Sequence, residues 1–191
     1  MDRIATRTLS RLEYEDPLLL LLAARPQTEA FAAGELSPDL RSLRKAEGKL
    51  SRERRQAAMF CHLLSQRLNK AVSMTVDEAQ DFDCVASWAV GQEVRFVPVQ
   101  LKELPPSEAN DRVAIEEILA GLSKYTDSRN TIVAVHLNRR ITIDPMRIAI
   151  PDLNINSLWL FAAVAPNLLQ WRLWGDLLTN PLESQHAYPD A

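Results

Sequence analysis

Apolar side chains recur every three or four residues between about 49 and 70, which is the period of one face of an α-helix. One carboxylate falls on this stripe, whose members are Glu53, Ala57, Phe60, Leu64 and Leu68. The opposite side is polar and rich in arginine. This pattern predicts an amphipathic helix with one acidic residue on its inward face.

Three strand-like runs follow, over residues 72–76, 82–90 and 94–104. Gly91 and Gln92 lie in the short gap between the last two runs, so these runs are predicted to form a tight hairpin. A second helix is predicted from about 110 to 125, and then an almost uninterrupted apolar strand over 131–137. Such a strand is expected where helices cover both faces of a sheet. The predicted core, residues 49–140, therefore runs helix, three strands, helix, strand.

Two regions flank this core. Residues 1–48 are predicted to form a helical N-terminal region, interrupted by prolines and by Gly34. Residues 141–180 are predicted to extend the same sheet through a strand at 147–150, a helix over about 157–165 and an alternating strand near 169–173. Residues 181–191 are predicted to be a frayed tail. The predicted fold class is α/β, with a mixed central sheet flanked by helices.

The leucine-rich run at 18–24 is as apolar as a membrane-spanning segment. It is about half as long as a spanning helix, and acidic residues precede it, so a buried helix and no membrane partner are predicted. The 191 residues are 47% hydrophobic and 25% charged, as in ordinary globular proteins. Cys61 and Cys84 lack metal-ligand spacing and are predicted to be reduced core thiols of a cytoplasmic protein.

The formal net charge of −3 does not favour nucleic-acid binding by the surface as a whole, so such a surface would have to be local. Basic side chains gather between 41 and 55 and again after the last core strand. The candidate phosphate-binding residues are Arg52, Arg54, Arg55, Arg139 and Arg140. The alternative is that these are ordinary solvated faces. His136, within an apolar strand, is predicted to be a hydrogen-bonded core histidine.

The third predicted strand carries polar side chains on one face. Residues two apart on a strand point the same way, so Gln100 and Lys102 share a face, while Val99 and Leu101 take the other. In the predicted hairpin, the start of the second strand lies beside the end of the third. This arrangement brings Asp83 near Gln100 and Lys102.

These residue types suit a magnesium site. Mg²⁺ accepts carboxylate and amide oxygens and keeps several waters, which makes Asp83, Gln100 and Glu53 candidate ligands. Lys102 beside such a metal can orient a water or stabilise charge on a phosphate. Asp81 shares the face of Asp83 and is an alternative ligand. Three structural alternatives also stay open. Gln100 and Lys102 can lie on a solvent-exposed strand face, the aspartates can be turn residues, and Glu53 can pair with an arginine on the helix surface.

The order of elements and of these residues resembles the PD-(D/E)xK, or restriction-endonuclease-like, nuclease superfamily over about residues 49–137. Asp83 matches the motif aspartate, Lys102 matches the motif lysine, and Glu53 resembles the helix glutamate. The resemblance implies a restriction-endonuclease-like αβββαβ core in which Lys102 assists the attacking water. It also implies a Mg²⁺-dependent endonuclease or exonuclease acting on nucleic acid, with DNA favoured over RNA.

Gln100 departs from this motif, because an acidic residue is usual at its position. The change removes one negative charge from the metal site, and no proline precedes Asp83. Two alternatives follow: a catalytically silent member of the same fold that acts as a binding or assembly module, and a structural partner protein with no nucleic-acid role. The sequence leaves open whether the protein is a monomer or a homodimer.

Overall fold

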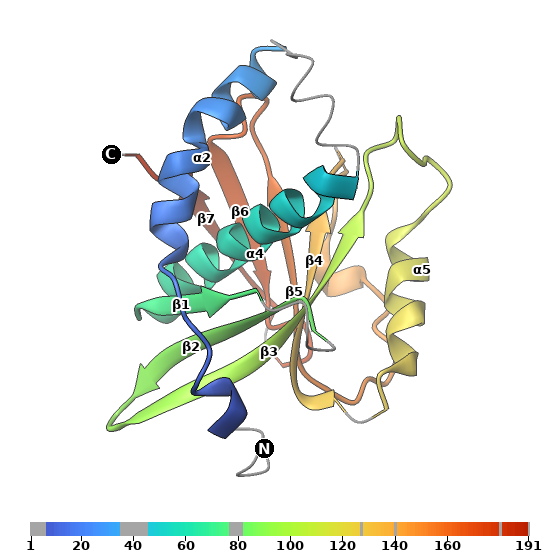
Figure 1. Ribbon diagram of the computed structural model, residues 1–191. Helices are drawn as coiled ribbons and strands as arrows, with labels where there is room; N and C mark the ends of the chain where they lie inside the picture. Colours follow the sequence, from blue (N-terminus) through green and yellow to red (C-terminus); the bar gives the residue numbers. More distant parts are fainter. Residues whose placement is uncertain are drawn as a thin grey trace.

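The computed structural model describes residues 7–34, 46–76, 82–126, 128–139, 141–179 and 181–190. One seven-stranded sheet organises them, and neighbours in the sheet follow one another along the chain (Figure 1). The strands are β1 (Val72–Thr75), β2 (Cys84–Val90), β3 (Glu93–Leu104), β4 (Ser128–Leu137), β5 (Ile155–Ala163), β6 (Gln170–Gly175) and β7 (Leu182–Ala187).

The sheet is mixed. Strands β1, β2 and β3 form an antiparallel meander, β3, β4 and β5 are parallel, and β5, β6 and β7 are again antiparallel. Val90 pairs with Glu93, so Gly91 and Gln92 form a two-residue turn, as predicted. Gly91 has a φ of 61°, a conformation that glycine adopts without the steric cost a side chain would bring.

Helices cover both faces of the sheet, as the predicted α/β class requires. The elements are α2 (Pro17–Ala32), α4 (Ala46–Leu68), α5 (Ile115–Ala120) and two 3₁₀ turns, η1 (Gly121–Lys124) and η2 (Pro145–Arg147). Helices α2 and α4 pack on one face, while α5 and η1 pack on the other (Figure 1). The observed order α4, β1, β2, β3, α5, β4 is the predicted order of helix, three strands, helix and strand.

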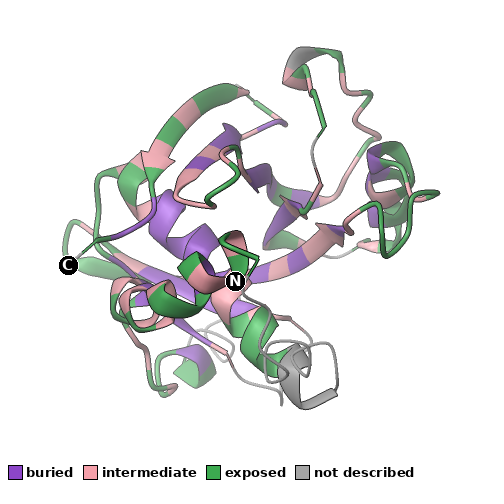
Figure 2. Ribbon diagram, turned by 90° about the horizontal axis from the view of Figure 1, so that it is seen from above, coloured by how far each residue is buried: buried purple, intermediate pink, exposed green. Residues whose placement is uncertain are grey.

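Each face of the sheet has its own hydrophobic core. On the α4 face, the ring of Phe60 lies 5.7 Å from that of Phe161. On the α5 face, Leu119 packs in a cluster with strand residues. Alternation along β4 divides its side chains, so Ile132 belongs to the first core and Val133 to the second. Figure 2 shows buried residues along the strands and on the inner side of α4, and exposed residues on the outer turns.

The helix predicted over 157–165 is wrong, because residues 157–163 lie in strand β5. Its run Leu158, Trp159, Leu160, Phe161 is buried throughout, with successive residues assigned alternately to the two cores. A short run that is apolar on all sides has no helical or strand period to distinguish the two structures. Burial on both faces of the sheet explains why the run is continuous.

Two further predictions in the C-terminal region are wrong. Residues 148–150 form no strand, and the chain before them makes the 3₁₀ turn η2. Residues 182–187 are not a frayed tail but strand β7, which pairs with β6 over six residues. Tyr188 anchors this end, because it is buried and its hydroxyl donates to the carbonyl oxygen of Leu21 at 2.9 Å.

The leucine-rich run lies in α2, which starts where Asp16 accepts a hydrogen bond from the Leu18 amide at 2.8 Å. The helix continues through Pro26, where an interruption was predicted. Leu21 is fully buried but Leu19 is 66% exposed, so one side of the helix packs on the protein. Across the described residues, no helix has the length and apolar character to cross a membrane. Cys61 and Cys84 are free buried thiols, as predicted.

Candidate functional site

The candidate site lies where β3 extends past its neighbour β2. The two strands pair from Cys84 opposite Val99, and the Asp83 amide donates to the Val99 carbonyl oxygen at 3.1 Å. Beyond this point, the register gives β3 no further partner residue in β2. The backbone amide and carbonyl of Leu101 therefore lie at an edge of the sheet. Side chains bind these two groups in place of a neighbouring strand.

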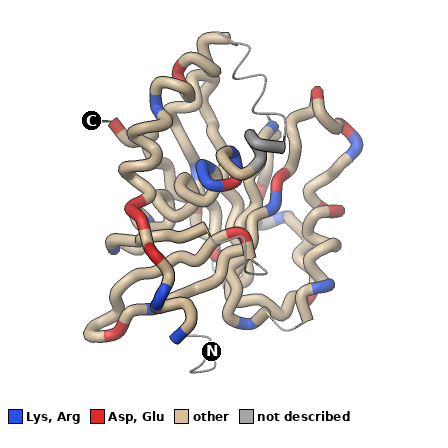
Figure 3. Tube along the Cα trace, viewed as in Figure 1, with Lys and Arg blue, Asp and Glu red and all other residues tan. Residues whose placement is uncertain are grey.

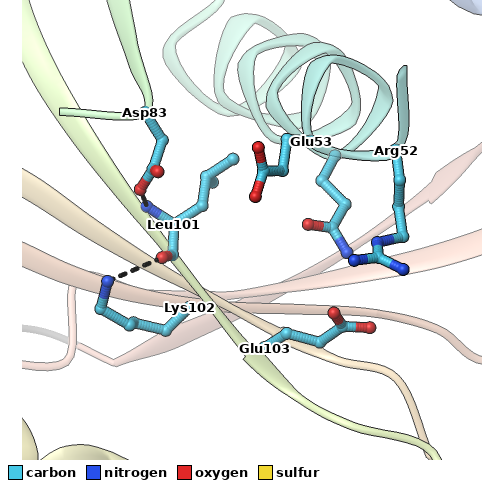
Figure 4. A pocket seen from close by; sticks show the side chains of 7 residues that line it. Arg52, Glu53, Asp83, Leu101, Lys102 and Glu103 are labelled. Atoms are coloured by element: carbon cyan, nitrogen blue, oxygen red, sulfur yellow. Dashed lines mark hydrogen bonds between the residues drawn. The ribbon is translucent and has the colours of Figure 1, made fainter. Parts of the chain in front are cut away.

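Two candidate residues bind the backbone of Leu101 (Figure 4). The Leu101 amide donates to Oδ2 of Asp83 at 2.6 Å, and Nζ of Lys102 donates to the Leu101 carbonyl oxygen at 3.1 Å. Asp83 also accepts a short hydrogen bond from the side-chain amide of Gln100. The predicted proximity of Asp83, Gln100 and Lys102 is thus present, organised by this strand edge.

A pocket of about 180 Å³ opens beside these residues. Helix α4 and the strand edge form its walls, with Arg52, Glu53, Gln56, Asp83, Leu101, Lys102 and Glu103 as its lining. In Figure 4 the carboxylate of Glu53 lies on the side of α4 that faces Asp83 and Leu101. Gln100 reaches the site through its hydrogen bond to Asp83. The structure therefore brings Glu53, Asp83 and Lys102 to one pocket.

The two sides of this pocket come from different faces of the sheet. Leu101 belongs to the core beneath α4, whereas Leu104 belongs to the core beneath α5. Lys102 shares the face of Leu104, and its Nζ lies 5.8 Å from the centre of the Tyr125 ring, which packs on that second core. The lysine side chain thus comes from the α5 face and Glu53 comes from α4, and both line the pocket at the strand edge.

Glu103 is a pocket residue that the sequence analysis did not select. It follows Val99 and Leu101 at a spacing of two, so strand periodicity places it on the face that packs under α4. Its Oε1 accepts a hydrogen bond from Nδ2 of Asn138 at 2.7 Å. A carboxylate at the end of an otherwise apolar strand face was the signal that could have found it.

His136 is hydrogen-bonded, as predicted, but it is only half-buried and contacts a residue of the pocket wall. Its Nδ1 is 3.1 Å from Nε2 of Gln56, which lines the pocket, and its ring stacks on Phe161 and Trp171 at 4.9 and 5.7 Å. Burial among these rings lowers the pKa of His136 to about 4, against the opposing influence of Glu103. The imidazole is therefore neutral at pH 7.

The predicted phosphate-binding arginines have different environments. Arg52 is exposed and lines the pocket. Arg54 binds both carboxylate oxygens of Glu15, at 2.9 and 2.5 Å. Burial lowers the pKa of Arg55, with Tyr188 acting in the opposite sense. Figure 3 shows basic and acidic positions side by side on α4, so the helix carries a mixed charge pattern.

Arg139 has a structural environment. Its guanidinium donates to the carbonyl oxygens of Pro105, Asn110 and Val113 at 2.7, 2.5 and 3.2 Å, which holds the loop between β3 and α5. Arg140 and the alternative ligand Asp81 lie outside the described residues.

Within the described part of the chain, no three histidine, cysteine or acidic side chains are grouped closely enough to hold a metal ion by themselves. Three carboxylates, those of Glu53, Asp83 and Glu103, nonetheless line the same pocket. The arrangement places three carboxylates, one ammonium group and one guanidinium around a small pocket.

The chain matches no protein-family model, no curated protein and no solved structure.

Proposed function

We propose that this protein is a metal-dependent nuclease that hydrolyses phosphodiester bonds in nucleic acid at the edge of β3. The observation that carries the proposal is the placement of Asp83 and Lys102 on the two backbone groups of Leu101, with Glu53 across the same pocket. An acidic group, an ammonium group and a helix carboxylate then surround one solvent-open space. The proposal is also supported by the resemblance of these three residues in the sequence to the restriction-endonuclease-like motif.

Asp83 and Gln100 would hold a Mg²⁺ ion. Mg²⁺ binds proteins through one or two oxygen ligands and keeps its remaining waters, so a pair of neighbouring donors is enough. Gln100 now donates its amide N–H to Asp83. Rotation of the amide by 180° would exchange nitrogen for oxygen and direct two oxygens toward one point. The donor set therefore fits a weakly bound, largely hydrated magnesium ion, which supplies a polarised water and neutralises phosphate charge.

Lys102 would act on the reacting phosphate. Its ammonium group is bound to the carbonyl oxygen of Leu101. The amide of the same residue is bound to the carboxylate of Asp83. An ammonium in this position stabilises the charge that develops on the phosphoryl oxygens as water attacks phosphorus and the bond to the leaving oxygen breaks. Arg52, exposed on the pocket wall, would bind a phosphate of the same strand.

The test compares wild type with Lys102→Ala on single- and double-stranded DNA and RNA in the presence of Mg²⁺. The lysine acts more strongly in the transition state than in the ground state, so turnover should fall about a hundredfold or more while affinity changes about twofold at most. Lys70→Ala is the matched control, because Lys70 is exposed at the end of α4 and lies outside the pocket lining.

Cleavage that survives Lys102→Ala at the wild-type rate would contradict the proposed role of this site. A catalytically silent binding module is the second candidate, and one observation favours it. Gln100 supplies a hydrogen-bond donor to Asp83 where a second carboxylate would hold metal tightly. If wild type binds the DNA and RNA substrates without cutting them, the result supports the binding module. If wild type neither binds nor cuts them, the remaining candidate is a structural partner protein with no nucleic-acid role.

A further inference from the structure

The ammonium group of Lys102 is held from two directions. Its Nζ donates to the Leu101 carbonyl oxygen at 3.1 Å and also lies over the ring of Tyr125, 5.8 Å from the ring centre. A lysine has four rotatable side-chain bonds, and one hydrogen bond leaves much of that freedom. The aromatic face supplies a second, electrostatic attraction that restricts where the charge can lie.

Tyr125 is itself fixed by the fold. It ends the 3₁₀ turn η1, where its amide donates to the carbonyl oxygen of Leu122 at 3.0 Å. Leu122 is buried in the core under α5, and the Tyr125 ring packs against that core at partial burial. The ring therefore presents one stable surface to the strand face from which Lys102 projects.

The same ring is close to a second cation. Nζ of Lys124 lies 5.5 Å from the ring centre, but Lys124 is not among the residues that line the Asp83 pocket. The contact of Lys102 differs because its ammonium also reaches the pocket edge. Lys124 thus offers an internal comparison: a lysine that touches the ring without belonging to the candidate site.

We propose that Tyr125 is a positioning residue, whose ring face holds the Lys102 ammonium against the β3 edge and directs it at the phosphate that enters the Asp83 pocket. The proposal rests on the proposed nuclease function for its catalytic consequence. Its structural part, an ammonium group sheltered by an aromatic ring, can be measured in the absence of any substrate.

The first measurement is the rate at which a water-soluble acylating reagent modifies Lys102, followed by peptide mass spectrometry on the full chain. Tyr125→Leu removes the aromatic face and keeps an apolar side chain, so acylation of Lys102 should become several-fold faster. Tyr125→Phe retains the face and should leave the rate within about twofold of wild type. Lys70 serves as the reference amine, and thermal unfolding verifies that each variant is folded.

The second measurement is turnover on the strand type that wild type cuts. Tyr125→Leu should lower kcat about tenfold with KM within about twofold, and Tyr125→Phe should restore kcat. Lys124→Ala should leave kcat within about twofold, because Lys124 does not line the Asp83 pocket. A purely structural Tyr125 would give parallel losses in stability and in the amount of active protein, without a selective change in kcat.

Equal acylation of Lys102 in wild type and folded Tyr125→Leu would overturn the positioning proposal. So would an unchanged kcat in Tyr125→Leu when wild type is active. If acylation responds to Tyr125→Leu and is restored in Tyr125→Phe, but wild type cleaves none of the nucleic acids, the ring contact is supported and the nuclease function is the part that fails.

Discussion

At the scale of single residues, the candidate site depends on Asp83. One oxygen of its carboxylate accepts hydrogen bonds from the Leu101 amide and from the side chain of Gln100. These bonds hold the carboxylate of Asp83 at the strand edge. Gln100 is therefore the residue that decides how much negative charge the site offers to a cation.

Gln100→Glu should make metal binding tighter and the metal-free protein less stable. The second carboxylate adds a full charge for Mg²⁺, which we expect to strengthen affinity about tenfold, and it repels Asp83 when no cation is bound. Calorimetric titration with Mn²⁺ measures the first effect. Thermal unfolding in chelator and in Mg²⁺ measures the second, as a midpoint lowered by a few degrees in chelator alone.

Gln92→Glu is the control for this change, since it adds the same charge in the exposed β2–β3 turn. It should affect neither metal affinity nor the metal dependence of the midpoint. Equal Mn²⁺ affinity in wild type and Gln100→Glu would show that residue 100 does not face the cation.

His136 predicts a pH dependence of stability. Its folded-state pKa of about 4 lies below the ordinary value of 6.5, so the unfolded chain takes up the proton first as pH falls. The contribution of the neutral imidazole to the free energy of unfolding is fully present above pH 6.5, and it decreases progressively as the pH falls toward 4. Between pH 7 and pH 5 the loss should be about 2 kcal/mol.

Urea unfolding at pH 7 and pH 5 measures this loss. His136→Phe keeps an aromatic ring beside Phe161 and Trp171 but cannot titrate, so its stability should fall by about 2 kcal/mol less than that of wild type over the same interval. The subtraction removes the contribution of carboxylates common to both proteins. Parallel pH profiles would mean that the folded His136 titrates near its ordinary pKa.

At the scale of elements, sequence periodicity predicted most of the site and missed part of the sheet. The stripe that includes Ala57 and Phe60 predicted α4, and the spacing of Gln100 and Lys102 predicted their shared face. Glu103 was not predicted, because it lies on the face of β3 opposite to Gln100 and Lys102, which is otherwise apolar near it. Periodicity also could not identify β5, whose continuous apolar run fits a buried helix equally well.

Strand β7 was missed for another reason. Its burial pattern alternates between exposed and intermediate, and its sequence contains Glu183, Ser184, Gln185 and His186. A polar edge strand of this kind has little intrinsic signal, because pairing with β6 and the anchor at Tyr188 define it. Tertiary contacts of this sort are not encoded in local patterns.

Arg139 stabilises an element boundary. Removing its guanidinium leaves three carbonyl oxygens of the loop before α5 without their donor, so Arg139→Ala should lower the free energy of unfolding by about 1–3 kcal/mol. Urea unfolding measures the change. Arg147→Ala is the matched control, because the Arg147 side chain is 88% exposed and pairs with nearby Asp144; its effect should stay within about 0.5 kcal/mol. Equal stabilities for the two variants would contradict the assigned role of Arg139.

At the scale of the whole molecule, the sheet brings together groups from its two opposite faces. Helix α4 contributes Glu53 on one side, and the α5 face contributes Lys102 on the other. Both residues line the pocket at the edge where β3 extends beyond the end of β2. The net charge of −3 offers no general attraction for a polyanion, so recognition must come from this local arrangement. A cation bound at the pocket would change the local balance of charge in favour of phosphate.

The location of a bound metal tests this account most directly. Crystals of wild type grown with Mn²⁺ should show an anomalous-difference peak about 2.1 Å from a carboxylate oxygen of Asp83 and from Oε1 of Gln100, with waters filling the remaining positions. Crystals of Asp83→Asn under the same conditions should lose that peak. A peak at another place in an actively cleaving protein, or none in the Asp83 pocket at saturating Mn²⁺, would contradict the proposed metal-dependent site.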